Sequence, residues 1–546
     1  MTANKKRLTL LLTLLLFMVS SVLILVPSQI MNHHIWTYLG TSDNRFHMMR
    51  IEGLADALKN GNLFPKINMS FIDGFGYVAN LFYSNFMLYP AAILRLCGLS
   101  MSKVTVIYFF ILNFLTFISA FWSFKMIKGS YWNSLIFSFM YTSSAYRLHN
   151  LLFRYDLGEL GAFIFLPIAF VGIYSIFYGD KKQWLALALG ITGIIYCHPL
   201  SPLLVAFLIL CCIVLNLKEM RADLQIFLSL VKATGVSILL SLAYFLPMLE
   251  QMKNMTFKLS DAKPNLELNA SKPMSLMTDS VNNNISQPTL GLVVILALIV
   301  MWMNYKHIQQ KSTRQLLVLG SSLLFISTNL FPWIIIQKTF LKMLQFPWRL
   351  DMIVTLLLCF VFAENAGYFF NTNLKRYLLL VVILMIGVSS GRNLVKMYPN
   401  NSVSYAKYNT LDTYSIGAGQ EYLPLASNLE SFRTISHKPR VVAGRSKLSF
   451  YKKQGNTITL RFKGAKKAKV VLPLIYYKGY TGTIDDQEMV KVFAGKEYNG
   501  LVTVNISGTG TLKVRYQETL MQRVGALLSI STLFIIIGFR IFKKTI

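Results

Sequence analysis

The chain has 546 residues, of which 54% are hydrophobic and only 14% are charged. This balance excludes an ordinary soluble globular protein and is typical of polytopic membrane proteins. The formal charge of +31 would suit a nucleic-acid-binding protein, but much of the Lys and Arg lies in short clusters between apolar segments. Basic residues in such places set membrane topology, so we expect no nucleic-acid partner.

The first predicted element is the apolar run from Leu8 to Val26, which follows a basic flank. The run is long and no clear cleavage site follows it, so it predicts an uncleaved first membrane span. Further apolar runs bring the expected number of transmembrane helices to about twelve, since a crossing takes roughly 20 residues. The expected spans are residues 8–27, 104–125, 131–147, 159–178, 183–198, 201–217, 225–247, 289–304, 315–331, 350–369, 376–391 and 520–541.

Clusters of Lys and Arg set the expected orientation. If the twelve spans alternate in direction, seven basic clusters all fall on the cytoplasmic side, as the positive-inside rule requires. These are Lys5–Arg7, Lys125/Lys128, Lys181–Lys182, Lys218/Arg221, Lys306–Arg314, Lys375–Arg376 and Lys543–Lys544. We therefore expect a multi-pass protein of the plasma membrane with both termini cytoplasmic and its long loops outside.

The first outer loop, residues 28–103, carries an amphipathic helix expected at 43–60. Helical spacing places Asp43, His47 and Arg50 on the apolar stripe of this helix. Burying an acid, an imidazole and a guanidinium is costly unless they pair or act, so the stripe predicts one wall of a site. The alternative is an Asp/Arg pair that only docks the helix.

Other ionisable residues lie at the outer ends of the expected spans. Arg154, Asp156 and Glu159 precede or open the fourth span, His198 ends the fifth, and Arg349 precedes the tenth. Ionisable groups at a membrane edge are functional candidates. Each also has a structural explanation, because an acid favours a helix N-terminus, a His can cap a helical hairpin, and an Arg can reach the headgroups. One geometry that would use them together is an acid that takes a hydroxyl proton while cations hold a lipid-linked phosphate.

The last outer segment predicts β structure. Thr457–Phe462, Val502–Ile506 and Thr511–Tyr516 alternate between apolar and polar residues, and Ser507–Gly510 predicts a hairpin between the last two. The many Lys and Arg residues here form either a solvated surface or one with affinity for an anionic envelope polymer or lipid headgroups.

The expected organisation has four parts. They are a transmembrane module at 1–391, an outer linker at 392–434, a small extracytoplasmic β-rich domain at 435–518, and a C-terminal transmembrane helix with a basic tail at 519–546.

Several motifs are absent from the sequence. It has no P-loop, no dinucleotide-binding glycine fingerprint, no HExxH and no Gly-x-Ser-x-Gly, and its five cysteines show no metal-ligand spacing. We expect neither a nucleotide nor a pterin cofactor. An activated lipid-linked donor is the more natural source of energy.

Five motifs stand along the chain: Ser42-Asp43-Asn-Arg-Phe-His47 with Arg50, Arg154-Tyr-Asp-Leu-Gly-Glu159, Gln345-Phe-Pro-Trp-Arg349, Gly419-Gln-Glu421-Tyr-Leu-Pro424 and Leu472-Pro-Leu-Ile-Tyr-Tyr477-Lys-Gly-Tyr480. Together they resemble the bacterial membrane proteins labelled 6-pyruvoyl-tetrahydropterin-synthase-related, which are similar to YfhO-like proteins. The similarity runs nearly the whole chain. The pterin label does not describe the chemistry, because the seven histidines lack the triad spacing of that small zinc enzyme.

The resemblance implies a GT-C type membrane glycosyltransferase with a polyprenyl-phosphate sugar donor and a teichoic acid-like acceptor. By position, Asp43 matches the catalytic acid of the first outer loop. Asn44 follows it where many GT-C proteins have a second acid, so Asp43 acts alone or is assisted by Asp73, Asp156 or Glu159. The missing pair weakens the case for a divalent metal without removing it.

The leading hypothesis is therefore a glycosyltransferase acting at the outer membrane face on an anionic envelope polymer. Asp43 would deprotonate the acceptor hydroxyl. Planar guanidinium groups suit phosphate. The donor phosphate would be held by Arg50, Arg154 and Arg349, and the reacting groups would be oriented by His47, Glu159 and His198. The alternatives are a lipid-linked sugar flippase or transporter, although no repeated half is visible, and a non-catalytic envelope-assembly scaffold.

Overall fold

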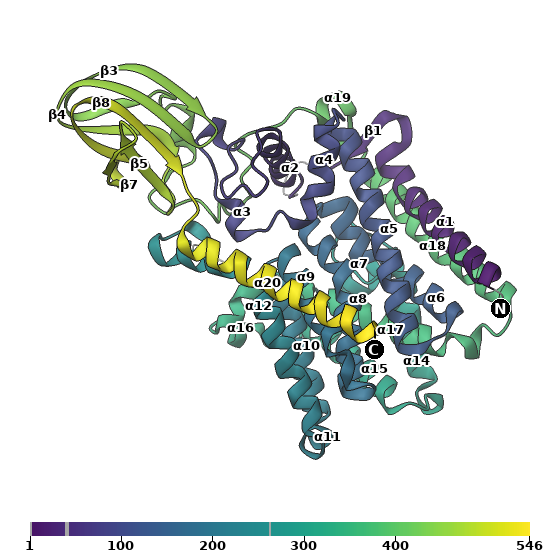
Figure 1. Ribbon diagram of the computed structural model, residues 1–546. Helices are drawn as coiled ribbons and strands as arrows, with labels where there is room; N and C mark the ends of the chain where they lie inside the picture. Colours follow the sequence, from purple (N-terminus) through teal and green to yellow (C-terminus); the bar gives the residue numbers. More distant parts are fainter. Residues whose placement is uncertain (1–2, 39–42, 261–263, 546) are drawn as a thin grey trace. The chain divides into compact units, whose positions relative to one another are not determined.

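The computed structural model describes residues 3–38, 43–260 and 264–545. It is mainly α-helical, with a β-sheet before the last helix (Figure 1). Thr41 and Ser42, which open the first-loop stretch, lie outside the described residues. The chain forms two units, and each is built from three separate segments. The first unit comprises residues 1–44, 98–237 and 262–410, and the second comprises residues 45–97, 238–261 and 411–546. The domain boundaries expected from the sequence remain predictions.

Within the described residues, seven helices are long and apolar enough to cross a membrane: Asn4–Ile30, Met101–Lys128, Leu157–Tyr178, Leu224–Asn254, Pro347–Phe369, Asn373–Met397 and Leu520–Phe539. They confirm the expectation of a polytopic α-helical membrane protein. The other five expected spans are also helical, but they have only 12 to 16 residues. A crossing takes roughly 20 residues, so whether these five cross remains a prediction. The sides on which the termini lie remain predictions as well.

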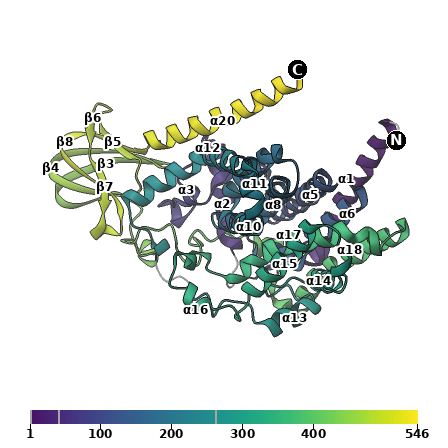
Figure 2. The same ribbon diagram turned by 90° about the horizontal axis from the view of Figure 1, so that it is seen from below.

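In the first unit, α8 (Leu157–Tyr178) packs against α5 (Met101–Lys128) and α9 (Trp184–Cys197). Figure 2 shows α14 (Leu292–Met303), α15 (Lys311–Ile326) and α17 (Asp351–Phe369) together, and these three pack against one another. The remaining helices of this unit are α1 (Ala3–Leu25), α6 (Tyr131–Thr142), α7 (Ala145–Leu148), α10 (Ser201–Leu215), α11 (Leu217–Ala222), α13 (Pro273–Val281), α16 (Trp333–Ile336), α18 (Asn373–Met397) and α19 (Tyr405–Tyr408). Two short strands, β1 (His34–Trp36) and β2 (Ser402–Ser404), pair antiparallel.

Glycines allow α8 and α9 to approach closely. A Cβ atom at Gly172 would lie 2.3 Å from the backbone nitrogen of Leu187, and one at Gly190 would lie 2.3 Å from that of Ala169. Small residues let helix backbones come together in this way. Because α8 and α9 form a tight helical hairpin, the start of α8 and the end of α9 lie at the same end of the pair.

The second unit contains a six-stranded antiparallel sheet with the order β3-β4-β8-β5-β6, and β7 also pairs with β8 (Figure 1). The strands are β3 (Arg440–Gln454), β4 (Thr457–Ile475), β5 (Tyr480–Ile484), β6 (Glu488–Val490), β7 (Val492–Gly495) and β8 (Leu501–Tyr516). In β4, Ile458, Leu460 and Phe462 are buried while Arg461 and Lys463 are exposed. Period-two alternation therefore places one face of this sheet in the core.

The prediction of a hairpin turn at Ser507–Gly510 is wrong. Strand β8 runs unbroken through these residues, and both of its halves pair with β4, with Gly508 opposite Ala465 and Gly510 opposite Phe462. The register shifts on both sides of Ala465. Gly508 has a φ of +80°, which glycine adopts without a Cβ clash, so the glycine-rich segment forms an irregularity within one strand rather than a reversal.

The helices of the second unit are α2 (Asn44–Lys59), α3 (Ala79–Phe82), α4 (Tyr89–Leu96) and α20 (Leu520–Thr545), and α12 (Leu224–Asn254) contributes residues to both units. The sequence correctly predicted α2 as an amphipathic helix. His47 and Arg50 lie on its buried side, with exposed fractions of 2% and 1%, while Arg45 and Asp56 are exposed.

Candidate functional site

The candidate site is built around the turn that leads into α8. A π-helical segment, His149–Arg154, ends at Tyr155, which has a left-handed φ of +60°. The hydroxyl of Tyr155 donates to the carbonyl oxygen of Trp36 and so holds this unusual backbone conformation. Asp156 then caps α8, because its Oδ1 accepts the backbone N–H of Glu159 at 3.0 Å.

Arg154 is the centre of an ion-pair network. Its Nη2 lies 3.0 Å from Oδ2 of Asp156, and its Nη1 lies 3.2 Å from Oε1 of Glu159. Oδ2 of Asp43 lies 3.6 Å from the same Nη2, and the backbone N–H of Asp43 donates to the carbonyl oxygen of Arg154 at 3.1 Å. Burial disfavours the charged guanidinium, but Glu159, Asp156 and Asp43 outweigh it and raise the pKa of Arg154.

Glu159 joins this network to Arg349. Nε of Arg349 lies 3.2 Å from the same Oε1 that Arg154 contacts, and the hydroxyl of Tyr146 donates to the other carboxylate oxygen at 3.0 Å. Nη1 of Arg349 donates to the carbonyl oxygen of Leu344 and to Oε1 of Gln345. Both charged partners are buried, so each depends on the other for compensation of its charge.

His198 follows the last residue of α9. Its Nδ1 lies 2.8 Å from the hydroxyl of Ser201. The ligand-type atoms of Asp156, Glu159 and His198 all lie within 4.8 Å of one another, so these three residues could hold a metal ion. The guanidinium groups of the network contact the same two carboxylates, however, and compete with any cation for their oxygens.

Two aromatic rings border the charged cluster. Phe346 and Trp348 stack with their ring centroids 5.0 Å apart. The guanidinium carbon of Arg154 lies 5.0 Å from the ring centroid of Trp348, and that of Arg349 lies 5.0 Å from that of Phe346. Both rings are half-buried. Cation–π attraction therefore fixes each guanidinium against an aromatic face.

The three acids of the cluster differ in how much of each side chain is exposed to solvent. The side chain of Asp43 is 39% exposed, whereas those of Asp156 and Glu159 are 4% and 1% exposed. Asp43 is also the carboxylate with the longest contact to Arg154. Of the three acids, Asp43 is thus the one that a substrate can reach without displacing buried groups.

His47 and Arg50 belong to the second unit and form a different cluster. Nη2 of Arg50 donates to the carbonyl oxygens of Tyr83 and Ser84, each at 2.7 Å, and its Nη1 lies 3.3 Å from Nδ1 of His47. The guanidinium also lies over the Tyr83 ring, 4.1 Å from its centroid. These contacts attach α2 to the segment that follows α3.

Five of the seven residues expected at the site come together in the first unit, namely Asp43, Arg154, Glu159, His198 and Arg349. Sequence reasoning named Asp156 as a possible second acid but missed Tyr146 and Trp348. Tyr146 lies near the end of an apolar run, where a tyrosine gives no signal beyond that of an interfacial aromatic. Trp348 stands within the QFPWR motif, where its place beside Arg349 could have identified it.

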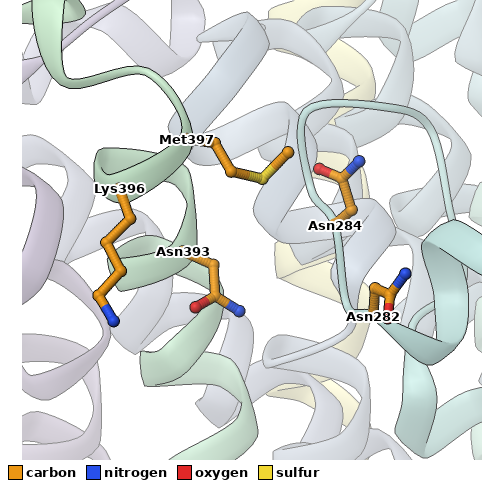
Figure 3. Close-up of a pocket in the computed structure, with 5 residues that line it drawn as sticks. All are labelled: Asn282, Asn284, Asn393, Lys396 and Met397. Atoms are coloured by element: carbon orange, nitrogen blue, oxygen red, sulfur yellow. The ribbon is translucent and has the colours of Figure 1, made fainter.

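A separate pocket of about 360 Å³ lies in the first unit. Asn393, Lys396 and Met397 of α18 line one side, and Asn282 and Asn284, from the segment after α13, line the other (Figure 3). None of these five lining residues belongs to the charged cluster.

No family model matches the chain. An uncharacterized protein of Lactococcus lactis subsp. cremoris (strain MG1363) is 25% identical over 238 residues, which cover 40% of this chain and 37% of that protein. The cryo-EM structure of arabinofuranosyltransferase AftD from Mycobacteria has a TM-score of 0.40 and 13% identity, and it covers 69% of this chain and 27% of that one. The chain thus matches well under half the length of either protein.

Proposed function

We propose that the chain is a GT-C type membrane glycosyltransferase that moves a sugar from a polyprenyl-phosphate donor to an envelope glycopolymer at the outer membrane face. The observation that carries the proposal is the position of Asp43. Its half-exposed carboxylate lies against a cluster of two buried acids and two arginines. Charged groups at the ends of apolar helices are costly to keep unless they have a function.

In the proposed reaction the Asp43 carboxylate accepts the proton of the acceptor hydroxyl. The acceptor oxygen forms a bond to the anomeric carbon of the sugar. The bond from that carbon to the phosphate oxygen breaks, and polyprenyl phosphate leaves with the electron pair. No nucleotide is consumed in this step.

Arg154 is the proposed phosphate-binding residue. Its contact with Asp43, at 3.6 Å, is longer than a good hydrogen bond, so a donor phosphate can take the place of this contact. Displacing Asp43 from Arg154 also leaves its carboxylate with less positive charge nearby and makes it a stronger base. Substrate binding would therefore activate Asp43.

The buried members of the cluster are proposed to position these groups. Glu159 holds both arginines, and Arg349 is only 5% exposed, so Arg349 acts mainly by keeping Glu159 in place. His198 supports the acids from the end of α9. Trp348 offers a half-buried aromatic face beside Arg154, on which the apolar face of a sugar ring can stack. In this proposal His47 and Arg50 hold α2 and do not contact the donor.

We propose an anionic, teichoic acid-like polymer as the acceptor. We also propose that both chain termini lie in the cytoplasm. The basic surface of the β-domain and the distribution of Lys and Arg between the apolar segments support these choices.

The test is mass analysis of envelope polymers from a strain that lacks the chain and is complemented with wild type, Asp43→Asn or Asp56→Asn. Asp56 is an exposed acid within α2 that is not part of the charged cluster, and it serves as the matched control. We expect the sugar modification to be lost in the deletion strain, to return with wild type and Asp56→Asn, and to stay absent with Asp43→Asn at equal protein levels.

Two results would contradict the proposal in different ways. Unchanged envelope polymers in the deletion strain would contradict the proposed glycosyltransferase function. Full sugar modification of the polymers with Asp43→Asn would show that Asp43 is not the general base, but it would not contradict the proposed transferase function.

A further inference from the structure

The β3–β4 hairpin carries an unbalanced charge. Between Arg440 and Ile475 the sequence has ten Lys or Arg residues and no Asp or Glu. Eight of the ten are exposed: Arg440, Arg445, Lys447, Lys452, Arg461, Lys463, Lys466 and Lys467. None of the ten forms an ion pair with a carboxylate of the described residues.

The register of the hairpin places like charges opposite each other. Arg445 of β3 pairs with Lys466 of β4, and Lys447 pairs with Lys463. Like charges directly opposite across antiparallel strands destabilise a sheet, and a folded protein usually separates them or neutralises them with acids. The hairpin does neither. Opposed like charges that destabilise the sheet and have no neutralising acid nearby indicate that the hairpin binds another molecule.

The cations also form a row. Arg461, Lys463 and Lys466 are exposed along β4 and Lys469 is half-buried, and the register shifts on both sides of Ala465 interrupt the regular alternation between them. Phe462, Ala465 and Ala468, which lie between these cations in the sequence, are buried in the core. The outer face of the hairpin is thus a basic strip with the form of an extended chain.

An anionic membrane surface fits this strip less well than a linear polymer does. Amphipathic membrane-binding elements combine basic residues with apolar side chains that enter the headgroup region. Among the described side chains of the hairpin, Phe450 is the one large hydrophobic group that is exposed, and the guanidinium carbon of Arg461 lies 5.5 Å from its ring centroid. The strip therefore offers charge along its length without apolar anchors.

We propose that the outer face of the β3–β4 hairpin binds a linear polyanion, with the polymer lying along the strands. Resting on the proposed function, we infer that this polyanion is the acceptor polymer and that the strip retains it between successive sugar transfers. Negative charges along the polymer would neutralise the opposed pairs Arg445–Lys466 and Lys447–Lys463.

The test measures binding of fluorescent linear inorganic polyphosphate to the full-length chain in neutral nanodiscs. In the R445E/K447E variant both opposed pairs become opposite-charge pairs. We expect polyphosphate binding to weaken by about tenfold or more per reversed charge. The unfolding temperature should not fall, because repulsion across the strands has been replaced by attraction. A misfolded variant would instead lose both properties.

The matched control is K478E/K491E, which makes the same change in net charge at two exposed lysines of the second unit outside the hairpin. Its polyphosphate affinity should stay within about threefold of wild type, since neither lysine belongs to the strip and solvent ions screen exposed charges over about 8 Å. The proposal is overturned if wild type binds no polyphosphate or if this control loses as much affinity as R445E/K447E. It is also overturned if the hairpin variant loses binding only to phosphatidylglycerol vesicles.

A sugar-transfer assay distinguishes failure of the polyanion site from failure of the proposed transferase function. R445E/K447E should still modify a short acceptor but transfer less sugar to long polymers, whereas Asp43→Asn should abolish both reactions. If Asp43→Asn has no effect while R445E/K447E loses polyphosphate binding, the transferase mechanism fails and the polyanion site stands.

Discussion

Nε of Arg349 lies 3.2 Å from Oε1 of Glu159, although 190 residues separate them in the sequence. This pair joins the start of α8 to the start of α17. Arg154 contacts the same carboxylate oxygen from a position only five residues away. Glu159 is therefore the acid that the two guanidinium groups share, and Arg349 has no other carboxylate partner among the described residues, whereas Arg154 also contacts Asp156 and Asp43.

Replacing Glu159 with Gln should destabilise the protein strongly. The change leaves Arg349 buried without its carboxylate partner, and breaking a buried ion pair from one side costs about 3–5 kcal/mol. Thermal unfolding of the purified protein in detergent measures the effect. Glu52→Gln breaks a more exposed ion pair with Arg95 and should cost about 1 kcal/mol or less. Equal losses of stability in the two variants would show that the buried Glu159 ion pairs contribute no more to stability than the more exposed Glu52–Arg95 pair does.

Replacing Arg50 with Met should lower stability but leave sugar transfer per folded molecule unchanged. The carbonyl oxygens of Tyr83 and Ser84 would lose their donor, at a cost of about 1–3 kcal/mol for each group left buried and unsatisfied. Arg45→Met, an exposed position on the same helix, is the control. A stable Arg50→Met protein without transferase activity would assign Arg50 to the donor phosphate instead.

Gly190→Ala should push α8 and α9 apart. The new methyl group would lie 2.3 Å from the backbone of Ala169, and overpacking of this kind costs about 1–3 kcal/mol. We expect a lower unfolding temperature and reduced transfer, because Glu159 and His198 stand at the same end of this helix pair. Gly367→Ala in α17 is the control, because a Cβ atom at Gly367 would have no other atom within 4 Å. It should stabilise that helix by about 0.5–1 kcal/mol, so a loss there would contradict the packing argument.

Lys453 should make stability depend on pH. Burial lowers the pKa of Lys453 from 10.5 to about 8, although its ammonium group donates to the carbonyl oxygens of Gly74 and Pro473. Between pH 8 and 10.5 the unfolded chain keeps a proton that the folded chain has lost, so stability rises with pH across this window. Below pH 8 the cost of the buried charge is fully present.

Thermal unfolding of wild type and of two Met variants at several pH values checks this effect. Lys453→Met should remove the rise in stability between pH 8 and 10.5. Lys452→Met, at the exposed neighbouring position, should retain it. The same pH profile in both variants would mean that Lys453 has an ordinary pKa in the folded protein.

The sequence predicted the helices well because long apolar runs leave few alternatives in a membrane. It also predicted the strand alternation of β4. It failed at Ser507–Gly510, since a glycine-rich segment between two alternating runs fits a tight turn and a bulged strand equally well. Pairing of both halves of β8 with β4 decides between them, and such long-range pairing is not encoded in local periodicity.

The candidate site was predictable only in part. Arg154, Glu159, His198 and Arg349 could be grouped because the direction predicted for each helix from the basic clusters brings them to one membrane face. The grouping of Asp43 with His47 and Arg50 rested on helical spacing, but α2 begins at Asn44 and so excludes Asp43. Spacing could not show that Asp43 contacts Arg154 while Arg50 binds the carbonyl oxygens after α3.

The two partners of Glu159 differ in when they are synthesised. At about 5–20 residues per second, the ribosome adds Arg349 roughly 10–40 s after Glu159. During this interval α8 must enter the bilayer with an acid near its end and without its distant counter-ion. Arg154 is already on the nascent chain at that time and is the counter-ion that Glu159 has available. The local ion pair can therefore form before the distant one, which needs the residues that precede α17.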